Sequence, residues 1–228
     1  MDGSNPPFTK LVQRLLSLAD QAGPALVIGV AGAPGVGKTT LVEALMHSLN
    51  PEYQPPESCR FAHVPMDGFH LSDRELRRQG LLGRKGAPET FDAGGYAALL
   101  GRLRVSPRPA VVYAPGFDRT LEQPVAGDIP VFPAARVILT EGNYLLLDRP
   151  EWRQVRSRCD EVWYIDDDEQ RHSRLLERHI RFGKSPDAAA AWVRDVDQPN
   201  AELVRASRSR ADLTIRLEAP PSPAGRGV

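Results

Sequence analysis

The sequence predicts an α/β fold in which helices cover both faces of a mostly parallel sheet. Short apolar runs that suit buried strands alternate with apolar residues at helical spacing, and this alternation is typical of parallel sheets. The chain has 228 residues, which is enough for one such domain with a single large core. The expected strands are 26–31, 61–64, 110–113, 137–140, 162–165 and 213–217.

The expected helices are marked by periodic leucines and by capping signals. Leucines recur at helical spacing before the first strand and again after a glycine-rich segment. Ser72 with Glu75 three residues later has the spacing of a capping box, and Ser185 followed by a proline is typical of a helix start. The helices are expected at 11–18, at 41–49, from 72, at 96–103, at 168–182 and from 185.

The composition excludes several classes of protein. Lys plus Arg and Asp plus Glu each number 29, so the formal net charge is zero and a general affinity for nucleic acid is not expected. No apolar run approaches the roughly 18–20 residues that a membrane span needs. The two cysteines lack metal-ligand spacing. We expect a soluble cytoplasmic protein with one domain over 1–218, including a helical lid at about 168–185, and a disordered tail at 219–228.

The glycine-rich segment matches the Walker A pattern G-x-x-x-x-G-K-[ST] of P-loop proteins. It lies between an expected strand and an expected helix, which is the context that the pattern requires. Backbone N–H groups and the helix N-terminus would hold the phosphates of a nucleoside triphosphate. Lys38 would reach the β- and γ-phosphates, and the Thr39 hydroxyl would bind Mg²⁺. The predicted phosphate-binding residues are Gly32, Ala33, Pro34, Gly35, Val36, Gly37, Lys38, Thr39 and Thr40.

Two acidic residues follow expected strands. Asp67 comes shortly after the strand 61–64, and Glu141 comes directly after the strand 137–140. The carboxyl ends of parallel strands face the ligand crevice. Asp67 could therefore accept the proton of an attacking hydroxyl, and Glu141 could hold Mg²⁺ directly or through water. From position alone, a turn aspartate and a turn-capping glutamate explain these residues equally well.

Three segments resemble the phosphoribulokinase/uridine kinase superfamily, which includes the type I pantothenate kinases. Asp67-Gly-Phe resembles the motif whose Asp is the proposed base, and Glu141-Gly-Asn resembles the segment with the Mg²⁺-linked acid. The stretch 84–92 resembles the Lys-Gly-x-Pro-Glu-Ser-Tyr-Asp stretch that borders the acceptor site of pantothenate kinases. The resemblance runs from about 26 to 217. It is closest to the group named nucleoside/nucleotide kinase-like or fructose-transport kinase.

The resemblance implies an ATP- and Mg²⁺-dependent kinase that phosphorylates a hydroxyl of a small metabolite, with Asp67 as the base. The acceptor could be a nucleoside, a sugar or a pantothenate-like acid. Members of the family are often homo-oligomers, and the sequence leaves the oligomeric state of this chain open. The segment 113–119 departs from the Tyr-Asp or Tyr-Ser before His of well-characterised members, so the resemblance alone does not assign uridine or pantothenate as the substrate of this chain. The predicted acceptor contacts are Phe69, His70, Arg84, Lys85, Phe91, Tyr113, Asp118, Arg119 and Asn143.

Four arginines lie on one face of the expected lid helix, namely Arg171, Arg174, Arg178 and Arg181. A solvated basic face is the ordinary explanation of such a stripe. The resemblance implies instead that Arg171 and Arg174 are lid arginines that stabilise the transferring phosphoryl group. Two other functions fit the same motifs: a nucleoside monophosphate kinase, and a nucleotide-binding sensor without phosphotransfer. A switch GTPase would need an Asn-Lys-x-Asp motif, which the sequence lacks.

Overall fold

A five-stranded parallel sheet forms the centre of the molecule, with the strand order β2-β5-β1-β6-β7. The computed structural model describes residues 6–21, 23–50, 56–105, 107–166 and 170–217. In the middle of the sheet, β1 pairs with β5 on one side and with β6 on the other. Residues from 27 onward in β1 and throughout β5 are buried, which explains their continuous apolar runs. The strands are β1 (Leu26–Gly32), β2 (Phe61–His63), β5 (Val137–Gly142), β6 (Glu161–Ile165) and β7 (Leu213–Ile215).

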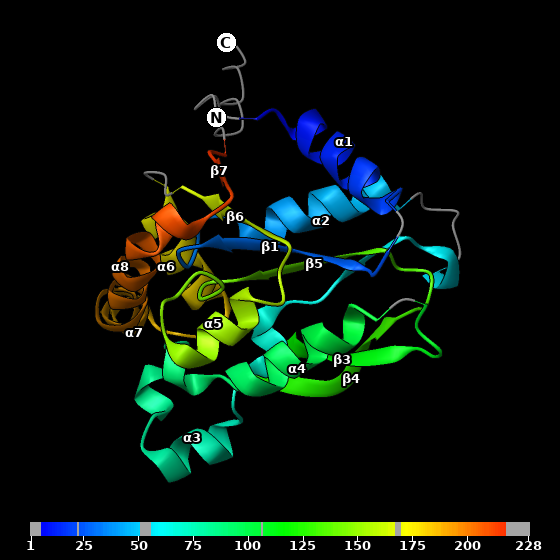
Figure 1. Cartoon of the computed structure of the whole chain (residues 1–228). Coiled ribbons are helices and arrows are strands. Elements are labelled where there is room, and N and C mark those ends of the chain that lie inside the picture. Colours follow the sequence, from blue (N-terminus) through cyan, green and yellow to red (C-terminus); the bar gives the residue numbers. More distant parts are fainter. Residues whose placement is uncertain (1–5, 22, 51–55, 106, 167–169, 218–228) are drawn as a thin grey trace, which may run out of the picture.

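Helices cover both faces of this sheet, as the sequence predicts. In Figure 1, α1 (Phe8–Ala19) and α2 (Lys38–Leu49) lie on one face, and α4 (Ala93–Leu103) and α5 (Pro150–Arg156) lie on the other. A further group gathers at one end of the sheet (Figure 1) and consists of α6 (Arg171–Arg181), α7 (Pro186–Trp192) and α8 (Gln198–Ala206). No helix among the described residues combines the length and the apolar character that crossing a bilayer would require.

The expected strand at 110–113 belongs to a separate antiparallel hairpin, and this placement differs from the prediction of one alternating sheet. The hairpin consists of β3 (Val112–Asp118) and β4 (Gln123–Val131). Prolines 115, 124 and 130 lie within these strands, and proline cannot donate to the ladder of a central strand. Most of β4 is exposed or half-buried. The hairpin therefore lies outside the central sheet, beside α4 (Figure 1).

The helix starts agree with their capping signals. Ser72 precedes α3 (Asp73–Gln79), and its hydroxyl accepts a hydrogen bond of 3.3 Å from the backbone N–H of Glu75. Ser185 does the same for α7, from Ala188, at 3.3 Å. The prediction did not include α5 and α8. The first residues of the expected lid helix fall within 167–169, and the expected tail falls within 218–228, so both lie outside the described residues.

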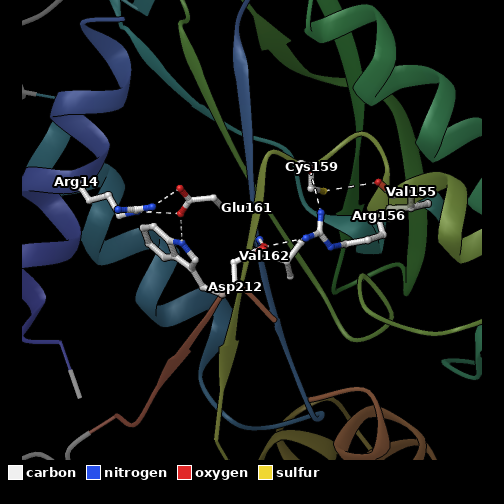
Figure 2. A network of polar contacts seen from close by, with 8 residues as sticks. Arg14, Val155, Arg156, Cys159, Glu161, Val162 and Asp212 are labelled. Carbon is white, nitrogen blue, oxygen red and sulfur yellow. Dashed lines mark hydrogen bonds and ion pairs between the residues drawn. The ribbon is translucent and has the colours of Figure 1, made fainter. Parts of the chain in front are cut away.

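Polar contacts fix the edge of the sheet where β6 begins (Figure 2). Arg14 of α1 donates to the carboxylate of Glu161 at 2.9 Å. On the other side, the carboxylate of Asp212 accepts 2.6 Å from the backbone N–H of Val162 and 2.9 Å from Arg156 of α5. These contacts join α1, α5 and the start of β7 to β6. They lie at the opposite end of β6 from Ile165, which pairs with Gly32 at the start of the phosphate loop.

Candidate nucleotide and acceptor site

The glycine-rich loop leaves the carboxyl end of β1 and leads directly into α2. Gly35 and Gly37 have positive φ angles of 81° and 93°, which other residues rarely adopt. A Cβ atom on Gly35 would also lie 2.6 Å from the side chain of Leu175 in α6. The loop therefore requires glycine both for its backbone conformation and for the close packing of α6 against it.

The side chain of Lys38 reaches back across the phosphate loop that precedes it. Its buried ammonium group donates hydrogen bonds of 3.0 Å to the carbonyl oxygens of Gly32 and Ala33, and one of 2.7 Å to Oδ1 of Asn143. The backbone thus places a positive charge at the mouth of the loop, where P-loop proteins hold phosphates. Asn143, which the sequence assigns to the acceptor, contacts the lysine of the phosphate loop.

Thr39 and Glu141 bring two oxygen atoms together beside the loop. The Thr39 hydroxyl donates to Oε1 of Glu141 at 3.1 Å, and Glu141 is buried. Burial raises the pKa of Glu141, and the negative charge of Asp67 adds to this, while Lys38 and the Thr39 hydrogen bond act in the opposite direction. Among the described residues, no group of three or more His, Cys, Asp or Glu side chains could hold a metal. Two protein oxygens suit Mg²⁺, which usually keeps several waters and phosphate oxygens as ligands.

Asp67 lies in a 3₁₀ turn (Met66–Phe69) that follows β2, with its side chain 25% exposed. Its carboxylate forms an ion pair with Arg119 from the turn of the β3–β4 hairpin. Burial opposes ionisation of Asp67, but the positive charges of His70, Arg119 and Lys38 outweigh it and hold the pKa of this carboxyl below its ordinary value. The carboxylate is therefore ionised and close to the lysine of the phosphate loop.

Two glycines allow the acidic segments to pack tightly. A Cβ atom on Gly68 would lie 2.1 Å from the carbonyl oxygen of Pro115 in the hairpin. A Cβ atom on Gly142 would lie 2.5 Å from the sulfur of Met66. The glycine after each acid thus removes the side chain that would separate the turn containing Asp67 from its neighbours.

An aromatic cluster lies beside Asp67. The ring of His70 is 4.0 Å from that of Phe91 and 4.9 Å from that of Phe117, measured between centroids. Phe69 packs on Tyr96 at 4.7 Å on the core side. The structure thus brings together the predicted acceptor contacts Phe69, His70 and Phe91. Phe117 was not among the predicted residues, although it lies within the segment 113–119 that the sequence analysis assigned to the acceptor.

Two cations border Phe117. The Nζ atom of Lys85 lies 5.5 Å from the centre of its ring, and the guanidinium carbon of Arg119 lies 4.9 Å from it. Lys85 also forms an ion pair of 2.7 Å with Asp73 and is only 12% exposed. These two predicted contacts therefore belong to the same cluster as His70.

Three other predicted acceptor contacts have different surroundings. Arg84 forms an ion pair of 2.7 Å with Glu89 and is 66% exposed. Tyr113 lies at the open end of the hairpin, 61% exposed. Asp118 accepts hydrogen bonds from the backbone N–H groups of residues 120 and 121, at 2.7 and 2.9 Å, and so shapes the turn that carries Arg119.

Helix α6 presents two of its four arginines to the phosphate loop. Arg171 is buried and donates to the carbonyl oxygen of Pro34 at 3.3 Å and to the side chain of Gln198 at 2.7 Å. Arg174 donates to the carbonyl oxygen of Gly35 at 2.9 Å. Arg178 is half-buried and Arg181 is exposed. The first two arginines therefore contact the loop itself.

The fold and this loop define the chain as a P-loop protein of the kinase type. It is 38% identical, over 55% of its length and 77% of the relative's, to an "ATP-dependent kinase-like protein" of Aspergillus versicolor. It is 36% identical to a "putative uridine kinase" of Schizosaccharomyces pombe, over 69% of this chain and 68% of that one. It is 30% identical to a pantothenate kinase of Leifsonia xyli, over 95% of this chain and 73% of that one.

Solved structures of P-loop proteins have a fold similar to that of this chain. A "putative fructose transport system kinase" from Silicibacter is 37% identical, with a TM-score of 0.79 over 92% of this chain and 98% of that one. The P-loop protein YFH7 of Saccharomyces cerevisiae shares the fold, with a TM-score of 0.76 over 94% of this chain and 100% of that one, at 18% identity. The chain belongs to the phosphoribulokinase/uridine kinase superfamily of P-loop kinases.

One family model matches a shorter segment. The methylmalonyl-CoA mutase-associated GTPase MeaB matches residues 3–54, which include β1, the phosphate loop and α2. This match covers the phosphate-binding part of the chain and none of the acceptor side.

Proposed function

We propose that the protein transfers the γ-phosphoryl group of ATP to a hydroxyl group of a small metabolite. The observation that carries this proposal is the position of Asp67, whose pKa the Lys38 ammonium helps to lower. An ionised carboxylate close to the phosphate-loop lysine is suited to accept the proton of an attacking hydroxyl. The kinase names of the relatives support the same reaction class.

In the proposed reaction, the acceptor oxygen forms a bond to the γ-phosphorus. The bond from that phosphorus to the β,γ-bridging oxygen breaks, and its electron pair leaves with ADP. Asp67 takes the proton of the hydroxyl. Lys38 and the backbone of the loop hold the phosphates, and Arg171 and Arg174 reach the developing negative charge from α6.

The oxygens of Thr39 and Glu141 would hold Mg²⁺ beside the phosphates. Both are hard oxygen donors at the mouth of the loop, 3.1 Å apart. The metal would neutralise charge on the transferring phosphoryl group. Burial raises the pKa of Glu141, and a cation bound at this carboxylate would stabilise its charged form.

An ADP-release assay with Mg-ATP and a panel of nucleosides, sugars, nucleoside monophosphates and hydroxy acids tests this function. At least one acceptor should raise the rate far above background. Asp67→Asn should cut that turnover by roughly 10²–10⁴-fold while ATP binding stays nearly intact. Asp128→Asn makes the same charge change at an exposed position of β4 and should leave the rate unchanged. A flat panel with sound ATP binding, or full activity of Asp67→Asn, would count against the proposal.

A further inference from the structure

Arg119, in the turn of the β3–β4 hairpin, contacts both the proposed base and an aromatic ring. Arg119 pairs with Asp67 and keeps its guanidinium group over the ring of Phe117, 4.9 Å from the ring centre. Its side chain is 41% exposed, so solvent and small molecules can reach it. The arginine is therefore anchored on an aromatic ring and still accessible.

The ion pair with Arg119 conflicts with the proposed role of Asp67. A carboxylate that binds a guanidinium group is a poorer proton acceptor, and the guanidinium group occupies Oδ2, one of the two oxygens that could take the proton. Arg119 therefore has to leave Asp67 before the proton moves. Water can reach the guanidinium group once it leaves, but another anion in this partly desolvated site would stabilise it better than water alone.

Two other acids near the cluster already have partners. Asp73 pairs with Lys85 at 2.7 Å, and Asp118 accepts hydrogen bonds from the backbone of its own turn. Within the described part of the chain, Arg119 forms its ion pair with Asp67. An anion brought by a ligand is the simplest replacement.

We propose that the acceptor carries an anionic group, a carboxylate or a phosphate, next to the hydroxyl that is phosphorylated, and that this group takes Arg119 from Asp67. The inference rests on the proposed function. Lys85, which borders the other side of Phe117, lies within the same cluster as a second cation. The exchange selects acidic acceptors, because a neutral acceptor leaves Arg119 on the base. It also releases Asp67 only when the correct substrate is present.

Matched pairs of compounds test the choice of acceptor. Each pair differs in one acidic group: glycerate and glycerol, pantothenate and pantothenyl alcohol, fructose 6-phosphate and fructose, uridine monophosphate and uridine. The acidic member of at least one pair should have a kcat/KM higher by roughly 100-fold. The first two pairs test a carboxylate and the last two a phosphate. A neutral compound that is used as well as its acidic counterpart would overturn the inference and leave the kinase proposal standing.

Binding separates this inference from the proposed function. Calorimetric titration of the same compounds into the protein with Mg-ADP measures affinity without turnover. Preferential binding of an acidic compound supports the inference even where the panel shows no phosphotransfer, which would count against the proposed function. Binding without a preference for the acidic members would overturn the inference.

The variant Arg119→Gln gives the residue-level test. The KM of the acidic acceptor should rise roughly 10–100-fold, while activity with its neutral counterpart stays level or increases because the base is released. Arg78→Gln removes the same charge from an exposed position of α3 and serves as the control. A purely structural role would lower both activities equally. That outcome, or an increase confined to the KM of ATP, would overturn the inference, and a melting curve of the variant checks its folding.

Discussion

The Nζ atom of Lys38 lies 2.7 Å from Oδ1 of Asn143, which is 105 positions further along the chain. This contact joins the phosphate loop after β1 to the segment after β5, and it exists because the two strands are neighbours in the sheet. Glu141, near the carboxyl end of β5, accepts a hydrogen bond from the Thr39 hydroxyl. The two pairs fix the phosphate loop relative to the candidate metal site.

Replacing Asn143 with aspartate should weaken nucleotide binding. The added carboxylate would pair with Lys38 and repel the phosphates at short range, where two charges about 4 Å apart interact by about 4 kcal/mol near a protein surface. We expect ATP affinity to fall by at least roughly 10-fold in Asn143→Asp. In Asn143→Ala, which adds no charge, it should fall less. Titration with a fluorescent ATP analogue measures both. Equal affinity of the aspartate variant and the parent would show that the phosphates do not approach Asn143.

The same contact illustrates what the sequence could and could not predict. Each central strand and the phosphate loop have a local signature, in apolar runs or in glycine spacing, so their positions follow from short segments. The pairing of Lys38 with Asn143 depends on the strand order, which periodicity does not determine. For this reason the contact of Asn143 with Lys38 does not follow from the motif that contains Asn143.

The hairpin shows a second limit. Its prolines and half-exposed residues gave β4 no clear apolar pattern, so the partner strand was not predicted. The ion pair of Asp67 with Arg119 crosses 52 positions and exists only because the hairpin folds over the turn after β2. Phe117 contacts His70, Lys85 and Arg119 because of the same folding of the hairpin over the turn. A single aromatic residue in a variable segment carries no signal of its own.

Gly68→Ala should disturb the base without changing any charge. The new Cβ atom would lie 2.1 Å from the backbone oxygen of Pro115, so the hairpin would have to move away. Overpacking of this kind typically costs about 1–3 kcal/mol of stability, and activity should fall with it. Gly83→Ala meets nothing within 4 Å and should change stability by less than about 0.5 kcal/mol. Chemical denaturation of both variants measures the difference, and similar stabilities would contradict the packing argument.

Arg171 and Arg174 should differ in their contribution to stability. Arg171 is buried between Pro34 and Gln198, so Arg171→Gln leaves buried groups without a partner at a cost of about 1–3 kcal/mol. For a chain of this size, that lowers Tm by about 2–12 °C. Arg174→Gln should lower Tm by less than about 2 °C.

Turnover separates the same two arginines from the rest of the stripe. Both variants should lose roughly 10²–10³-fold, because both side chains contact the loop that would hold the phosphates. Arg181→Gln, at an exposed position of the same helix, is the control and should affect neither property. Full turnover in Arg174→Gln would remove this residue from the proposed reaction.

His63 should make the stability of the fold depend on pH. It lies at the end of β2, and its Nε2 atom has no hydrogen-bond partner within the described part of the chain. Burial lowers its pKa from 6.5 to about 4. Between these pH values the unfolded chain therefore binds a proton that the folded chain does not. Stability from this group is fully present above pH 6.5 and is lost as the pH falls toward 4.

The variant His63→Phe isolates this effect, since it keeps a ring of similar shape and removes the titration. Between pH 7.5 and pH 5, the parent should lose roughly 2 kcal/mol more unfolding free energy than this variant, as each unit of pKa shift corresponds to about 1.4 kcal/mol. Urea unfolding at the two pH values measures the loss. His47→Gln, at an exposed position of α2, should behave as the parent does. If the parent and His63→Phe lose stability equally, the imidazole is not held neutral by burial, and other groups carry the pH dependence.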